Sequence, residues 1–281
     1  MFTTLMSVEQ LAECIDPLII DCRFNLGDVQ YGERSYLEGH IPGAYYLHLD
    51  HHLSSPVTPD TGRHPLPDLN RLGWHLQQLG LYPNRQVVVY DDASGAIAAR
   101  AWWLIRMLGH QSVALLDGGF PAWQARFPDR MEESIPATSA CAEDSSFEPI
   151  SLVKATVTSE QLESLLQQRT YLLVDARAAE RFRGEVEPID PVPGHVPGAV
   201  NRPFNDNLNN GLFKEPGALA EEWQALLGGY SPNQVIHMCG SGVTACHNLL
   251  AMEHAGLAGA KLYAGSWSEW IRSPSRPVVT N

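Results

Sequence analysis

One cysteine, Cys239, stands in a sequence setting that suits nucleophilic chemistry. It follows the apolar run Gln-Val-Ile-His-Met and opens the segment Cys-Gly-Ser-Gly-Val-Thr-Ala (239–245), after which an apolar, helix-forming stretch begins. Open α/β sheets bind ligands at the carboxyl ends of their strands. Gly240 and Gly242 let the backbone turn its N–H groups inward, and such a nest, with a helix dipole behind it, stabilises negative charge. We therefore expect Cys239 to react as a thiolate nucleophile.

Other anion-handling loops share part of this outline but need residues that the segment lacks. A Walker A loop requires Gly-Lys-Ser/Thr, and no lysine is present. A cysteine phosphatase loop requires an arginine six residues after the cysteine, where this chain has Ala245. A redox pair requires Cys-x-x-Cys, whereas Cys246 lies about two helical turns further on. The remaining alternative, a buried structural thiol, leaves the glycine-rich context unexplained.

The elements that would position this loop alternate between strand-like and helix-like segments. Short apolar runs predict buried strands, and longer segments with apolar residues at helical spacing predict helices. The predicted strands cover 18–21, 87–90, 112–116, 171–175, 234–238 and 260–264. The predicted helices cover 69–80, 97–108, 159–169, 219–228 and 244–256. This alternation predicts an α/β fold with parallel sheets flanked by helices.

The chain also repeats itself once. LIIDCR, GHIPGA and QVVVYDD in the first half return in the same order as LLVDAR, GHVPGA and QVIHMCG in the second. We expect two copies of one domain, at 1–130 and 151–281, with a polar linker at 131–150. Alignment of the two copies places Asp91 opposite Cys239. Because the carboxylate of Asp91 cannot replace the thiol as the group that carries sulfur, the N-terminal copy is expected to be catalytically inactive.

The composition of the chain limits which binding partners and which cellular compartment are expected. The formal net charge of −13 argues against nucleic acid and anionic membranes as partners, although a small anionic substrate can still bind a local nest. The five cysteines are irregularly spaced, which predicts no structural zinc site. The histidines His48, His51, His52 and His64 are expected in a solvated loop. No signal peptide and no long apolar run are found, so the cytoplasm is the expected compartment.

These motifs together resemble the tandem rhodanese family, and within it the 3-mercaptopyruvate sulfurtransferases. The resemblance rests on the duplicated domain, Asp-Ala-Arg, Gly-His-Val-Pro-Gly-Ala, the 239–245 loop and the closing Gly-Ser-Trp-Ser-Glu-Trp. It implies that Cys239 takes sulfur from a small anionic donor, holds it as a persulfide and passes it to a thiol or to cyanide. It also implies that the loop residues bind the substrate and that no cofactor or metal is needed. The loop residues are Gly240, Ser241, Gly242, Val243 and Thr244.

The resemblance assigns two further side chains to the site. Arg181 matches the first of two arginines that hold the carboxylate of mercaptopyruvate in the family, but the second falls near Asp190, where this chain has no arginine. His40 matches a histidine expected to assist proton transfer with Ser241. The preferred donor therefore stays open between mercaptopyruvate and thiosulfate, and a sulfur-carrier or protein-interaction module without turnover stays an alternative.

Overall fold

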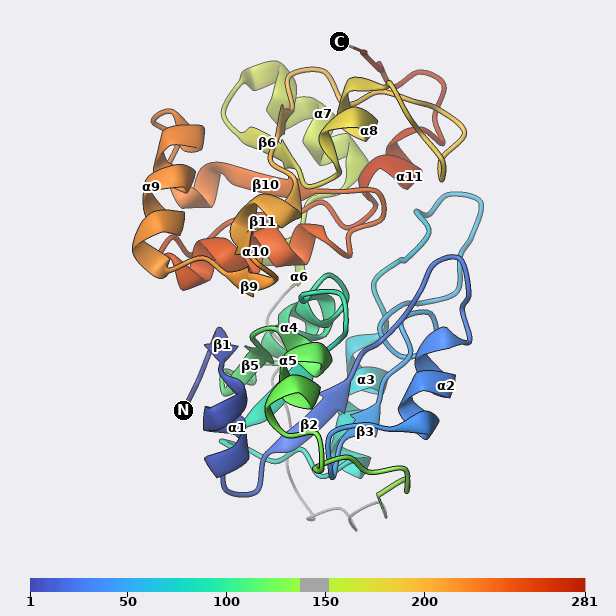
Figure 1. Ribbon diagram of the computed structural model, residues 1–281. Coiled ribbons are helices and arrows are strands. Elements are labelled where there is room, and N and C mark those ends of the chain that lie inside the picture. Colours follow the sequence, from blue (N-terminus) through green and yellow to red (C-terminus); the bar gives the residue numbers. More distant parts are fainter. Residues whose placement is uncertain (137–151, 281) are drawn as a thin grey trace. The chain divides into compact units, whose positions relative to one another are not determined.

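The structure is a computed structural model that describes residues 1–136 and 152–280 (Figure 1). The chain divides into two compact units. Unit 1 comprises Met1–Ser55 and the described part of Pro67–Ser151, and unit 2 comprises Pro56–Leu66 and the described part of Leu152–Asn281. The short segment Pro56–Leu66 thus packs with the second unit although it lies within the first half of the sequence. Most of the expected linker, and Cys141, lie outside the described residues.

Unit 1 is built on a parallel sheet with the strand order β1-β5-β4-β2-β3. Its strands are β1 (Leu5–Met6), β2 (Leu18–Asp21), β3 (Tyr45–Tyr46), β4 (Val87–Tyr90) and β5 (Val113–Leu116). Its helices are α1 (Val8–Glu13), α2 (Tyr31–Glu38), α3 (Leu69–Gln78), α4 (Ala98–Met107) and α5 (Gly119–Arg126). The residues of β2, β4 and β5 are buried throughout, as apolar runs in a sheet covered by helices must be.

Unit 2 repeats this plan with the parallel order β11-β10-β6-β7. Its strands are β6 (Leu172–Asp175), β7 (Val200–Asn201), β10 (Val235–Met238) and β11 (Lys261–Leu262), with an antiparallel pair β8 (Leu208–Asn209) and β9 (Leu212–Phe213). Its α-helices are α6 (Leu152–Ala155), α7 (Ser159–Gln168), α8 (Ala179–Arg183), α9 (Pro216–Leu227), α10 (Ala245–His254) and α11 (Ser266–Trp270). Two 3₁₀ turns are η1 (Phe204–Asn207) and η2 (Pro232–Gln234). The predicted fold class, two α/β domains with parallel sheets flanked by helices, is confirmed.

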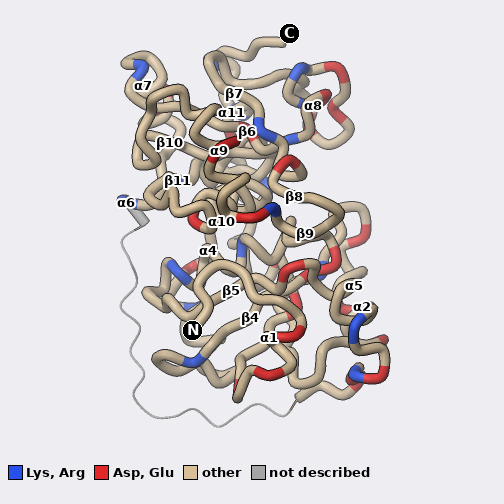
Figure 2. Tube along the Cα trace, turned by 60° about the vertical axis from the view of Figure 1, so that its left-hand side comes forward, with Lys and Arg blue, Asp and Glu red and all other residues tan. Residues whose placement is uncertain are grey.

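The internal strands β4, β5 and β10 contain no charged residue, and their tube is correspondingly tan in Figure 2. In unit 2 the side chains of β6 and β10 pack with Trp267 and Trp270 of α11 into one buried cluster. None of the helices in the described residues has the length and apolar character needed to cross a membrane.

One repeated motif has the same structural role in both units. Arg23 donates from Nε and Nη2 to Asp21 and from Nη2 to the carbonyl of Gly39 at 2.8 Å. In unit 2, Arg177 donates in the same way to Asp175 and to the carbonyl of Gly194 at 2.7 Å. The Asp-x-Arg block therefore fastens the loop after the first central strand to the Gly-His block, which explains why both blocks recur. Buried, forked ion pairs of this kind are costly to break.

Candidate active site

Cys239 lies directly after β10 and is held by the segment that begins α11. Its backbone N–H donates to Oγ of Ser266 at 3.1 Å, and its carbonyl accepts from the N–H of Trp267 at 3.0 Å. The carbonyl of Gly240 accepts from the N–H of Ser268 at 2.9 Å. Ser266 itself adopts a left-handed conformation, with φ 53°, which is uncommon for a residue with a side chain. The closing Gly-Ser-Trp-Ser-Glu-Trp motif is thus the support of the cysteine loop.

The loop folds back so that a backbone donor faces the sulfur. The N–H of Gly242 donates to Sγ of Cys239 at 3.2 Å, and the Cys239 side chain is buried, with the residue 2% exposed. Gly242 has φ +77°, and a Cβ there would lie 2.3 Å from the carbonyl oxygen of Ala264. Only glycine fits this position without a shift of the loop. After Val243 and Thr244 the chain enters α10, so the predicted order of strand, glycine-rich loop and helix is what the structure contains.

The hydrogen-bond partner of Ser241 is His64. Nδ1 of His64 lies 2.7 Å from Oγ of Ser241, and both side chains are buried. His64 comes from the segment 56–66 that belongs to unit 2. The expectation of a solvated loop is therefore wrong for this histidine, as it is for His48, which is also buried.

The described contacts of His40 are structural, and its expected part in proton transfer stays a prediction. It is fully buried in unit 1, its Nδ1 lies 2.7 Å from the carbonyl oxygen of Tyr36, and its ring stacks on the Tyr36 ring. His195 does the same in unit 2, with Nδ1 2.7 Å from the carbonyl oxygen of Phe182 and its ring stacked on Phe182. Two histidines in equivalent blocks thus anchor equivalent helices. The contact with Ser241 that the sequence assigned to His40 is made by His64 instead.

Two guanidinium groups lie beside the cysteine loop. A Cβ placed on Gly240 would lie 2.8 Å from Nη2 of Arg63 and 3.7 Å from Nη2 of Arg181. Arg181 is the arginine expected from the sequence, and Arg63 was missed. The place where the second arginine was sought holds Asp190, whose carboxylate accepts from Nη1 of Arg63 and, at 3.2 Å, from Nη2 of Arg181. Arg63 therefore supplies the second guanidinium from a distant part of the sequence.

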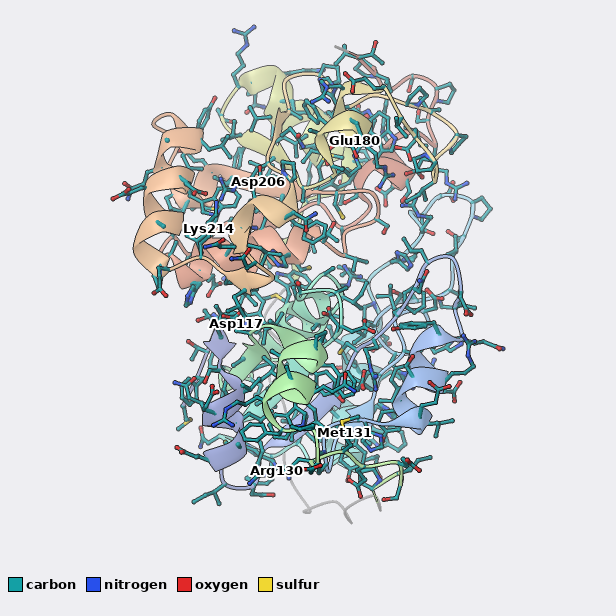
Figure 3. All side chains as sticks on the ribbon, in the orientation of Figure 1. Asp117, Arg130, Met131, Glu180, Asp206 and Lys214 are labelled. Atoms are coloured by element: carbon teal, nitrogen blue, oxygen red, sulfur yellow. The ribbon has the colours of Figure 1, made fainter. Side chains whose placement is uncertain are left out.

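The carboxylates around these arginines are themselves buried. Glu187 accepts from Arg181 at 2.7 Å and from Arg177 at 3.3 Å, which fixes the loop after α8 (the helix of Glu180, labelled in Figure 3). Burial acts to raise the pKa of Glu187, but hydrogen bonds from Arg181 and from backbone N–H groups bring it below its usual value. For Asp190, burial outweighs the neighbouring arginines and raises the pKa.

The matching loop of unit 1 holds a carboxylate where unit 2 holds the thiol. Oδ1 of Asp91 accepts from the N–H groups of Ala93 and Gly95, and Oδ2 accepts from those of Ile97 and Ala98, at 2.8–2.9 Å. Asp91 is fully buried, and this burial raises its pKa. The loop thus converges four backbone donors on one anion, which illustrates the nest that the shared fold can build at this position.

The other described cysteines are inert by their surroundings, and the described residues contain no metal-ligand cluster. Cys14, Cys22, Cys239 and Cys246 are outside any disulfide, and Sγ of Cys246 lies 3.5 Å from the carbonyl oxygen of Gly242 in the loop. Burial raises the pKa of Cys22 well above its usual value, as suits an inert core thiol. No group of three or more His, Cys, Asp or Glu side chains in residues 1–136 and 152–280 is arranged to hold a metal ion.

Comparison with known proteins gives matches over nearly the whole chain. The model of the rhodanese-like domain matches residues 4–126 and again 158–273. A Pseudomonas aeruginosa protein whose name proposes 3-mercaptopyruvate sulfurtransferase activity is 47% identical over 98% of each chain. A Mycobacterium tuberculosis protein whose name proposes thiosulfate sulfurtransferase activity is 37% identical over 98% of this chain and 96% of its own.

Among solved structures, the fold is similar to that of SseA from Escherichia coli, described as a 3-mercaptopyruvate sulfotransferase. The TM-score is 0.77 at 32% identity, over 94% of this chain and 99% of SseA. Sequence and structure comparisons thus point to proteins of one kind.

Proposed function

Because this chain belongs to the rhodanese family and is a sulfurtransferase, we propose that it takes sulfur from 3-mercaptopyruvate and carries it as a persulfide on Cys239. The observation that carries this proposal is the buried thiol at the end of β10, with the N–H of Gly242 donating to its sulfur at 3.2 Å. A donor of this kind stabilises an ionised sulfur in both the thiolate and the persulfide.

In the first half-reaction the Cys239 thiolate attacks the thiol sulfur of the donor. A new S–S bond forms, the C–S bond of mercaptopyruvate breaks, and its electron pair leaves with the carbon fragment. That fragment must gain a proton to become pyruvate, while the donor thiol must lose one. Ser241 and His64, 2.7 Å apart beside the loop, form a pair that can relay this proton.

Thiosulfate makes a different demand on the site. Its leaving group is sulfite, which departs as an anion and needs no proton at the moment of bond cleavage. The Ser241–His64 pair therefore favours a thiol donor such as mercaptopyruvate over thiosulfate. The guanidinium of Arg63 or Arg181 provides the positive charge that a donor carboxylate requires.

In the second half-reaction an acceptor removes the outer sulfur. A thiolate or cyanide attacks the outer sulfur of the persulfide, the S–S bond breaks, and Cys239 is released as a thiolate, ready for another donor. This is covalent, ping-pong catalysis carried by one residue. We propose that unit 1 has no part in the covalent chemistry, because its loop carries Asp91. The expected domain boundaries, 1–130 and 151–281, stay part of this proposal.

The cellular setting is proposed on chemical grounds. A nucleophilic thiol is kept reduced in the cytoplasm, which we propose as the compartment. The net charge of −13 disfavours nucleic acid and anionic membrane surfaces as partners. The partners proposed are a small anionic sulfur donor and a thiol or cyanide acceptor.

Steady-state kinetics test the proposal. Pyruvate release from mercaptopyruvate, with a thiol as acceptor, should be abolished by Cys239→Ser and retained by Cys246→Ser, the matched change of a buried cysteine in the same unit. A kcat/KM for thiosulfate that exceeds the value for mercaptopyruvate by about tenfold, an energy difference of about 1.4 kcal/mol, would overturn the choice of donor. Absence of turnover with either donor would favour a carrier or interaction module.

A further inference from the structure

The charged side chains around the cysteine loop form a cluster with no net formal charge. It pairs three arginines with three carboxylates, and every carboxylate accepts from at least one of the arginines. We refer to these residues as the charge cluster: Arg63, Arg177, Arg181, Asp175, Glu187 and Asp190. An anionic donor that approaches Cys239 therefore meets guanidinium groups whose charge is already balanced.

Asp190 is the member of the charge cluster that touches both guanidinium groups beside Gly240. Its carboxylate accepts from Nη1 of Arg63 through one oxygen and from Nη2 of Arg181 through the other. The Asp190 side chain is 4% exposed, so water screens its charge only weakly. The negative charge of Asp190 therefore acts strongly on an anion that binds beside the cysteine loop.

The Arg63 guanidinium has one edge, formed by Nε and Nη2, that Asp190 does not contact. Its Nη1 is taken by Asp190, whereas its Nε is buried and has no hydrogen-bond partner among the described residues. Its Nη2 points to Gly240, as the 2.8 Å approach to a Cβ built there shows. Elsewhere in the molecule, Arg23 and Arg177 hold a carboxylate by this same pair, Nε and Nη2. The Nε–Nη2 edge of Arg63 thus has the geometry to hold one carboxylate.

We propose that Asp190 is a specificity-determining residue that restricts the site to donors with a single negative charge. By balancing Arg63 and Arg181 it leaves one guanidinium edge for one carboxylate, and it repels the second charge of a dianion such as thiosulfate. The inference rests on the proposed function, because it concerns donors that load Cys239. The choice of donor is thereby attributed to the charge of residue 190 and not to the residues of the cysteine loop.

The test compares two donors in two variants that remove the same formal charge. Asp190→Asn keeps the shape of the side chain, and Glu185→Gln is the control, because Glu185 is 53% exposed at its side chain and pairs with Arg183 outside the charge cluster. The quantity measured is the ratio of kcat/KM for thiosulfate to kcat/KM for mercaptopyruvate. This ratio should rise about tenfold in Asp190→Asn and stay within about twofold in Glu185→Gln. A poorly screened negative charge repels a dianion about twice as strongly as a monoanion, so its removal favours thiosulfate.

The outcomes separate this inference from the function on which it rests. A wild-type protein that turns over neither donor contradicts the proposed function. A wild-type protein that turns over, with the same ratio in Asp190→Asn as in the wild type, overturns only the role of Asp190. A merely structural role would lower kcat/KM for both donors equally and leave the ratio unchanged.

A measurement on the unmodified protein guards against a variant that does not fold. Sulfate and acetate are tested as competitive inhibitors against mercaptopyruvate at constant ionic strength. The balanced charge cluster predicts that sulfate, despite its double charge, inhibits no more strongly than acetate. Inhibition by sulfate at about one-tenth of the acetate concentration, or lower, would overturn the inference.

Discussion

Replacement of Gly242 by alanine tests the geometry of the cysteine loop, and the chain offers a matched control. Gly242 and Gly256 have the same backbone angle, φ +77°. A Cβ at Gly242 would lie 2.3 Å from the carbonyl oxygen of Ala264 and 3.0 Å from its carbonyl carbon, whereas a Cβ at Gly256 would meet nothing within 4 Å. The two substitutions thus share the conformational cost of a left-handed alanine and differ only in the collision with backbone.

The expected magnitudes follow from these two terms. The left-handed conformation costs about 1 kcal/mol at either position, so Gly256→Ala should lower the free energy of unfolding by about that amount. At Gly242 the loop must also move away from Ala264. This movement breaks the hydrogen bond from the Gly242 N–H to Sγ of Cys239. A hydrogen bond to a charged acceptor contributes about 1.5–3 kcal/mol, which corresponds to a loss of about 10- to 100-fold in kcat/KM.

The assay is sulfur transfer to a thiol acceptor, measured beside urea unfolding for both variants. Gly256→Ala should keep the wild-type kcat/KM with a slightly lower free energy of unfolding. Gly242→Ala should have a reduced kcat/KM in the absence of urea, although the variant is still folded there. Equal activity in the two variants would refute the claim that the Gly242 N–H supports the reacting sulfur.

Three further perturbations probe other parts of the molecule. Ser241→Ala should lower kcat/KM about 10- to 100-fold with mercaptopyruvate and much less with thiosulfate, because the sulfite leaving group needs no proton. Equal losses of kcat/KM with the two donors would count against the proton relay. Asp91→Asn should lower the free energy of unfolding by about 2–4 kcal/mol in urea titrations, because an amide NH₂ would face backbone N–H donors, while kcat/KM stays unchanged. Burial lowers the pKa of His237 from 6.5 to about 3. Between these two pH values the unfolded chain binds a proton at His237 that the folded chain does not. The free energy of unfolding should therefore fall as the pH falls below about 6.5. Unfolding measured against pH should show a shallower loss in His237→Leu, and an unchanged slope would contradict this assignment.

Most of the fold, and the cysteine loop that forms the candidate site, could be predicted from the sequence because their signals are local. The apolar runs 87–90 and 235–238 mark buried strands without reference to the rest of the chain. The small residues after Cys239 predict a backbone turn at the end of a strand, and the structure has Gly242 in the required left-handed conformation. The internal repeat then identified Asp91 as the counterpart of Cys239.

Arg63 and His64 could not be found in the same way. Their segment lies between elements of unit 1 in the sequence but packs on the cysteine loop of unit 2, and no periodicity signals such a crossing. A signal was present in Gly62, where a Cβ would lie 2.5 Å from the carbonyl oxygen of Gly265. A glycine beside an Arg-His pair and two prolines indicates a close backbone approach, but the sequence does not say to which backbone.

His40 has a structural role that the sequence did not reveal. It stands in a recurring motif, and the recurrence reflects a shared structural role, the anchoring of a helix through the carbonyl of Tyr36. The same tie is present at His195 in unit 2 and at His40 in unit 1, whose loop carries Asp91 in place of a cysteine, so the tie does not depend on a thiol in the loop. A repeated block therefore indicates common architecture, whereas the chemistry that we propose rests on a position where the two copies differ, Cys239 against Asp91.

The most direct test of the account is the mass of the intact protein after exposure to mercaptopyruvate. The reduced protein should gain one sulfur atom, and cyanide should remove it. The adduct should form in Cys246→Ser and be absent in Cys239→Ser, with peptide mapping placing the sulfur on Cys239. A sulfur adduct that persists in Cys239→Ser, or that forms on another cysteine of the wild-type protein, would contradict the claim that Cys239 carries the transferred sulfur.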